Sequence, residues 1–156
     1  MHEMDETEKR LSKWGVELAT EGEWAGWYRR VRGDSYEGVN GPFYFRSDPS
    51  QGLRLAFRAE QRHMNAAGFM HGGCIMTFAD SCLFMIARPV LKGRYGVTAS
   101  LNGEFAGSAH VGDLVEGSGE IVKAGGSLVF VRGLITTAGK PVLNFSGIIK
   151  IVKPRS

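Results

Sequence analysis

The chain has 156 residues, of which 43% are hydrophobic and 22% are charged, with a formal net charge of +3. This composition is typical of one globular domain with a substantial core, and it excludes a disordered chain or an integral membrane protein. No block of basic residues interleaved with aromatic residues occurs, so we expect no nucleic-acid partner. The longest apolar run is near the lower limit for a membrane span and contains Asp80, so we expect no membrane partner.

The chain begins with a charged stretch that lacks the apolar segment of a secretion signal, so we expect a cytoplasmic protein. The two cysteines, Cys74 and Cys82, lie in one apolar run. On a helix, about 12 Å of rise would separate them, which is too far for a disulfide bond. Reduced thiols in a protein core agree with a cytoplasmic location.

The first 41 residues are predicted to form a helical covering segment of a single domain that spans residues 1–156. Residues 4–18 indicate an amphipathic helix, because Leu11, Trp14 and Leu18 follow i, i+3, i+7 spacing. The glycine-rich and aromatic stretch that follows predicts irregular structure with a short helical piece. The core of the domain is predicted at residues 42–153.

Alternating apolar and polar residues predict strands over much of that core. The predicted strands are 43–46, 53–60, 97–105, 114–123, 128–136 and 142–152. Glycine-containing turns join the last three at hairpin spacing, which implies an antiparallel sheet. In the 97–105 strand, Val97 and Leu101 are predicted to face the interior and Thr98 the opposite side.

Residues 72–87 predict a helix that is apolar around its whole circumference, and therefore buried all round. Pro89 is predicted to stop this helix. Its polar exceptions, Thr77, Asp80 and Ser81, share one face. A carboxylate is costly to bury among apolar residues, so Asp80 is a candidate functional group. One long helix and several antiparallel strands predict an α+β domain with the sheet wrapped around the helix.

The segment before Asp80 carries a motif with fixed spacing: Asn65, Gly68, His71, Gly72 and Gly73. This pattern resembles the signature of hotdog-fold acyl-CoA thioesterases of the phenylacetate-degradation (PaaI-like) type, in which an aspartate follows nine residues after the histidine. The resemblance implies the hotdog fold, an acyl-CoA substrate, hydrolysis of its thioester to a free carboxylate and coenzyme A, and an active site at a dimer interface.

The resemblance also implies roles for individual residues. Asp80 would act as general base or nucleophile, and the Gly72 amide would polarise the substrate carbonyl. Asn65 and His71 match residues that position the carbonyl or the attacking water. Thr98 matches a hydroxyl residue that assists the aspartate in relatives.

Elementary chemistry supports the assignment of Gly72. Amides at the start of a helix lack intrahelical partners and lie at the positive end of the helix dipole, where they can stabilise an oxyanion. The absence of a Cβ lets a substrate approach closely.

Further residues are candidates for substrate contact: Gly73, Met70, Thr77, Arg88 and Lys123. Arg88 and Lys123 could bind the phosphates of coenzyme A, although solvated surface charges explain them equally well. Met70 could line an acyl tunnel, although core packing explains it too. No metal is expected, because His63 and His71 have no further ligand at suitable spacing. No cofactor is expected beyond the coenzyme A moiety of the substrate.

The spacing within the motif restricts the assembly. Gly72 and Asp80 are eight residues apart, which places them about 12 Å apart along one helix. One reacting carbonyl cannot lie about 3 Å from both. The site therefore requires two chains, and we expect a homodimer, assembled further into a dimer of dimers. The alternatives are a hotdog-fold hydroxyacyl-thioester dehydratase and a non-catalytic acyl-CoA-binding protein.

Overall fold

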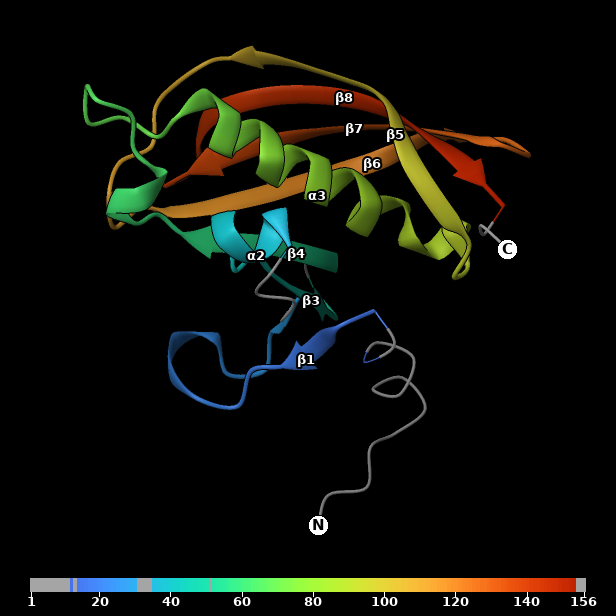
Figure 1. Cartoon of the computed structure of the whole chain (residues 1–156), viewed down its shortest axis with the longest axis horizontal. Coiled ribbons are helices and arrows are strands. Elements are labelled where there is room, and N and C mark those ends of the chain that lie inside the picture. The colour runs from blue at the N-terminus through green and yellow to red at the C-terminus, as the bar shows by residue number, and fades with distance from the viewer. Residues whose placement is uncertain (1–11, 13, 31–34, 51, 154–156) are drawn as a thin grey trace. The chain divides into compact units, whose positions relative to one another are not determined.

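The computed structural model describes Ser12 and residues 14–30, 35–50 and 52–153. The chain packs as two compact units, Met1–Phe57 and Arg58–Ser156 (Figure 1). The predicted division into 1–41 and 42–153 stays a prediction. The elements of the first unit are β1 (Val16–Leu18), η1 (Gly22–Trp24), β2 (Tyr28–Arg30), α2 (Tyr36–Asn40), β3 (Tyr44–Asp48) and β4 (Gly52–Arg58). Those of the second are η2 (Gln61–His63), α3 (Gly72–Leu91), β5 (Tyr95–Phe105), β6 (Leu114–Ala124), β7 (Leu128–Thr137) and β8 (Lys140–Val152).

In the first unit, strands β1 to β4 pair antiparallel in chain order. Aromatic side chains hold this unit together, with the Trp24 ring stacked on Tyr44 at a centroid distance of 4.1 Å. The helix predicted for residues 4–18 is wrong at its end, because Val16–Leu18 is strand β1; the part before Ser12 lies outside the described residues. Gly15 has a φ of 67°, a left-handed conformation that is not helical and that lies directly before the strand.

In the second unit, the strands lie in the order β6, β7, β8, β5, and each neighbouring pair is antiparallel. Helix α3 lies across these four strands and contacts all of them (Figure 1). The core between helix and sheet is fully apolar, with Phe78, Leu83, Phe145 and Ile149 at most 1% exposed. The predicted α+β architecture, with an antiparallel sheet against one long helix, is confirmed.

Helix α3 ends later than predicted. It continues through Pro89 to Leu91, so the expected stop at Pro89 is wrong. Proline in the last turn removes one backbone hydrogen bond, and the burial of the Leu91 side chain in the core offsets this loss. The helix ends instead at Lys92, whose φ of 51° and ψ of 41° are left-handed. The Arg94 guanidinium then donates to the carbonyls of Val90 and Leu91, which have lost their helical partners.

The prediction that α3 is buried all round is also wrong. The sheet covers one side of the helix, and the other side is half-buried or exposed in this chain. Members of the open face are Gly73, Met76, Thr77, Asp80, Ser81, Phe84, Met85 and Arg88. By length and composition α3 is also the one helix among the described residues that could cross a membrane, but its other face is packed in the core of the second unit.

A β-bulge in β5 changes which side chains face α3. Thr98 pairs with Ile149 of β8 and Ser100 with Ile148, so Ala99 is the extra residue. The Thr98 hydroxyl is bonded to a side chain of α3, and beyond the bulge a Cβ built on Gly103 would lie 3.0 Å from Met76 Sδ, again toward α3. The extra residue reverses the alternation, which is why the prediction that Thr98 faces away from the interior is wrong.

Candidate active site

Asn65 organises the loop that leads into α3. Its side-chain Oδ1 accepts hydrogen bonds from the backbone N–H groups of Ala67 (2.9 Å) and Phe69 (3.2 Å). The backbone N–H of Asn65 donates to the Phe69 carbonyl at 2.7 Å. Gly68 completes the turn with a φ of 85°, which an L side chain would disfavour. The asparagine therefore fixes the shape of the loop through local bonds of the Asx type.

His71 is the N-cap of α3. Its Nδ1 accepts a hydrogen bond from the Gly73 N–H at 2.9 Å, so this ring nitrogen carries no proton. Its backbone N–H donates to the His63 carbonyl at 2.8 Å, which attaches the cap to the preceding turn. A Cβ built on Gly73 would lie 3.0 Å from this Nδ1, so a larger residue here would crowd the imidazole that caps the helix.

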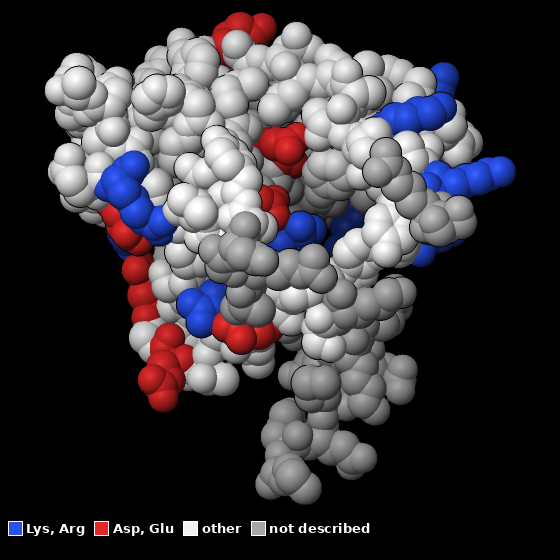
Figure 2. Space-filling view, in the orientation of Figure 1, with Lys and Arg blue, Asp and Glu red and all other residues white. Residues whose placement is uncertain are grey.

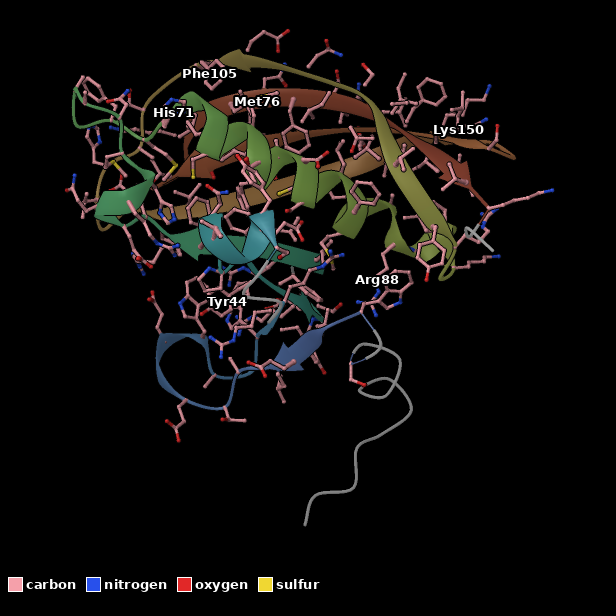
Figure 3. The ribbon with its side chains drawn as sticks, in the orientation of Figure 1. Tyr44, His71, Met76, Arg88, Phe105 and Lys150 are labelled. Atoms are coloured by element: carbon pink, nitrogen blue, oxygen red, sulfur yellow. The ribbon has the colours of Figure 1, made fainter. Side chains whose placement is uncertain are left out.

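Gly72 is the first residue of the helix, and its N–H is the candidate oxyanion donor. Among the described residues, no group accepts a hydrogen bond from this N–H. The ring of Phe105, which is 56% exposed, lies over the glycine, since a Cβ built there would be 3.2 Å from Phe105 Cζ. Figure 3 shows His71, Met76 and Phe105 together at this end of α3. A carbonyl oxygen placed here would meet a free amide at the positive end of the helix dipole.

Asp80 lies two turns further along the open face of α3. The Thr98 hydroxyl donates to Asp80 Oδ1 at 2.6 Å, so the structure brings together these two predicted site residues from α3 and β5. Thr77 lies between the helix start and Asp80, and its hydroxyl donates to the Gly73 carbonyl at 2.8 Å. Asp80 is half-buried, so it is not enclosed within this chain.

The predicted site residues therefore form two clusters within one chain. The helix-start cluster comprises Asn65, Met70, His71, Gly72, Gly73 and Thr77, and the second is the Asp80–Thr98 pair. About 12 Å of helix rise separates Gly72 from Asp80, so one chain does not bring amide and carboxylate to one reacting atom.

Met70, within the helix-start cluster, is buried at 4% exposure and bridges to Met64 across the loop. Two other predicted substrate contacts lie outside both clusters. Arg88 is exposed near the far end of α3 (Figure 3). Lys123 is exposed on β6 beside a second strand irregularity.

Sequence reasoning missed two residues of this region. Phe105 packs on Gly72. His63, the last residue of η2, is buried, and its carbonyl accepts the His71 N–H. No sequence signal pointed to His63, because Glu60 three residues earlier does not form the Ser/Thr-x-x-Glu/Gln pattern of a capping box. Within the part of the chain that the structure describes, no group of three or more His, Cys, Asp or Glu side chains is placed to hold a metal ion.

Comparison with known proteins shows which family this chain belongs to. The thioesterase superfamily model matches residues 67–143, which include the helix start, Asp80 and Thr98. A Pseudomonas aeruginosa protein described as an esterase is 31% identical over 112 residues, covering 71% of this chain and 84% of that protein. Acyl-coenzyme A thioesterase 13 of Mus musculus is 31% identical over 90 residues, covering 56% of this chain and 64% of the mouse protein.

Solved structures show the same fold. A Streptococcus pneumoniae protein described as a hypothetical thioesterase, with coenzyme A, has a TM-score of 0.63 at 19% identity, covering 73% of this chain and 88% of that chain. The Escherichia coli PaaI protein of the phenylacetic acid degradation operon has a TM-score of 0.58 at 17% identity, covering 64% and 72%. The chain belongs to the thioesterase superfamily. It has the predicted hotdog fold, and it is a thioester hydrolase, as the motif indicated.

Proposed function

We propose that this thioester hydrolase is an acyl-CoA thioesterase, which converts an acyl-CoA or aryl-acyl-CoA and water to a carboxylate and coenzyme A. One observation carries the proposal: α3 begins with an amide that has no partner among the described residues, and it carries a hydroxyl-bonded carboxylate about two turns later. The name of the mouse relative and the coenzyme A in the Streptococcus structure support a coenzyme A thioester as the substrate.

Each cluster would supply one half of the chemistry. The Gly72 N–H would donate to the thioester oxygen and stabilise the negative charge that develops there. Asp80 would either take a proton from the attacking water or attack the carbonyl carbon itself. Thr98, by donating to Oδ1, would hold the carboxylate in one rotamer and leave Oδ2 for the reaction. Asn65 and His71 would keep the helix start rigid.

The two halves would come from two copies of the chain. The open face of α3 carries Asp80, and β5 lies at one end of the strand order with no strand among the described residues on its other edge. Tyr95 and Val97 on β5 are 43% and 50% exposed. Where α3 lies in front of the strands, the surface of the second unit is mostly uncharged (Figure 2). A second copy on this face would bury it and bring its Asp80 toward Gly72 of the first.

The remaining assignments are parts of the same proposal. Gly73, Met70 and Thr77 would shape the acyl side of the site, and Arg88 and Lys123 would bind coenzyme A phosphates. We place no metal or prosthetic group in the mechanism, because amide and carboxylate supply both the oxyanion donor and the base. We further propose a cytoplasmic location, where coenzyme A thioesters and reduced cysteines both occur.

A panel of short, long and aromatic acyl-CoAs with a thiol-trapping dye tests the proposal. We expect coenzyme A release with at least one member, and a loss of about 10²-fold or more in kcat for Asp80→Asn. Glu120→Gln is the matched control, because this exposed carboxylate pairs only with Arg132 among the described residues. Absence of release with every member, or full activity in Asp80→Asn, would refute the proposed function.

A further inference from the structure

We propose that His63 is a positioning residue, whose buried imidazole sets the position of the Gly72 amide; this rests on the proposed function. His63 is 3% exposed, and it is the one buried polar or charged residue in the part of the chain that the structure describes. A titratable side chain is costly to bury, and apolar residues surround the rest of this core. Its placement one turn before the motif therefore calls for a specific role.

The imidazole fixes the short helix η2 in front of the motif. His63 Nδ1 accepts a hydrogen bond from the Glu60 N–H at 3.0 Å, and the His63 backbone N–H donates to the Glu60 carbonyl, also at 3.0 Å. These reciprocal bonds close the turn from both ends. They hold the His63 backbone in one orientation.

The His63 backbone then holds the start of α3. Its carbonyl accepts the His71 N–H at 2.8 Å, and His71 is the cap residue directly before Gly72. The buried ring, the His63 carbonyl and the His71 backbone thus form a continuous series of contacts that ends at the candidate oxyanion donor. The donor needs a fixed direction, because a misplacement of about 1 Å in an active site can lower the rate about 10²-fold.

The chemistry of the ring determines which substitutions preserve the contact. The contact in which Nδ1 accepts a hydrogen bond requires a neutral imidazole with its proton on Nε2. An asparagine side chain can place its Oδ1 near the position of Nδ1 and accept the same Glu60 N–H. A phenylalanine fills the volume of the ring but accepts nothing, which leaves the Glu60 N–H without this partner.

The test compares His63→Phe and His63→Asn, with His110→Phe and His110→Asn as matched controls, since the His110 side chain is 56% exposed. We expect His63→Phe to lower kcat for an acyl-CoA about tenfold or more while KM changes less than about threefold. His63→Asn should keep kcat within about threefold of the wild type. An unchanged kcat in His63→Phe, or an equal loss in both variants, would overturn the positioning role.

Two readouts do not depend on turnover. Hydrogen exchange at residues 71–75 should be faster in His63→Phe than in wild type or His63→Asn, with both variants folded by circular dichroism. The nitrogen NMR spectrum should show His63 Nδ1 unprotonated, and a protonated Nδ1 would contradict the contact. If the wild type hydrolyses no acyl-CoA, the proposed function fails, whereas these two readouts still decide whether His63 positions the helix start.

Discussion

Thr98 Oγ1 lies 2.6 Å from Asp80 Oδ1, a length typical of a hydroxyl that donates to a carboxylate. A hydrogen bond to a charged group contributes about 1.5–3 kcal/mol. We therefore expect Thr98→Val, which keeps the shape of the side chain, to lower kcat roughly tenfold to a hundredfold. Thr98→Ser retains the hydroxyl and should stay within about threefold of wild type. Equal activity of the valine and serine variants in steady-state kinetics would contradict this role for Thr98.

The Gly72 amide allows a sharper test, because proline is favoured at the first position of a helix and lacks the N–H. His71 has a φ of −62° and a ψ of 133°, which are compatible with a following proline. We expect Gly72→Pro to fold and to lose about 10²-fold or more in kcat. Gly72→Ala keeps the N–H and adds a Cβ against the movable Phe105 ring, so it should lose much less. Similar kcat values for the two variants would exclude the amide as the oxyanion donor.

The cysteine thiols give a prediction about pH. Burial raises the pKa of Cys74 to about 11, and burial also raises the pKa of Cys82. The reactive thiolate forms only above the pKa, so native protein at about pH 8 should resist iodoacetamide at both cysteines. Unfolded protein, with ordinary thiol pKa values of about 8.5, should be alkylated twice. Rapid alkylation of native protein, measured by mass spectrometry, would contradict the burial of these thiols.

At the residue scale, the motif includes the residues that shape the loop and cap of α3, but it did not predict what each of them contacts. Their catalytic roles stay predictions. Fixed spacing identifies Asn65, His71 and Gly72, because local bonds of a loop and a cap are encoded in neighbouring residues. The face of Thr98 was not predictable from alternation. The bulge at Ala99 arises from pairing with β8, about 50 residues later in the chain. The alternation of residues within β5 does not indicate how that strand pairs with β8.

Among the elements, the strands of the second unit were predicted within a few residues, and so was the start of α3, but its C-terminal end was not. Period-2 alternation persists over long strands and is easy to read. Helix ends depend on the balance between one lost hydrogen bond at Pro89 and the core contacts of Leu91, a balance decided by tertiary packing. In the first unit, pairing with β2 and the turn at Gly15 override the helical spacing of residues 11–18.

The left-handed end of α3 predicts a stabilising substitution. Lys92 has a φ of 51°, a conformation that glycine adopts without steric strain. We expect Lys92→Gly to raise the free energy of unfolding by about 1 kcal/mol, which corresponds to about 2–4 °C in Tm. Gly93 has a φ of 78°, so Gly93→Ala should lower Tm and serves as the opposite control. A Tm that is unchanged or lower in Lys92→Gly, by calorimetry, would contradict the observed helix end.

At the scale of the whole molecule, the open face of α3 is what the single chain leaves incomplete. A half-exposed helix face that carries Met76, Phe84 and Met85 together with a hydroxyl-bonded aspartate, beside a strand with a free edge among the described residues, fits an interface between two copies. The eight-residue spacing from Gly72 to Asp80 is enough to predict the need for a second chain, because helix rise is fixed by backbone geometry. The identity of the acyl group is set by side-chain shape at that interface, which one sequence does not encode in any local pattern.

The measurement that most directly tests the two-chain site uses mixed dimers. One chain carries Asp80→Asn and the other Gly72→Pro, each with a different affinity tag, and the mixed dimer is purified through both tags. A site built from Gly72 of one chain and Asp80 of its partner leaves one intact site in each mixed dimer. We therefore expect two nearly inactive homodimers and a mixed dimer with about half the wild-type kcat. A mixed dimer as inactive as its parents would contradict the shared site.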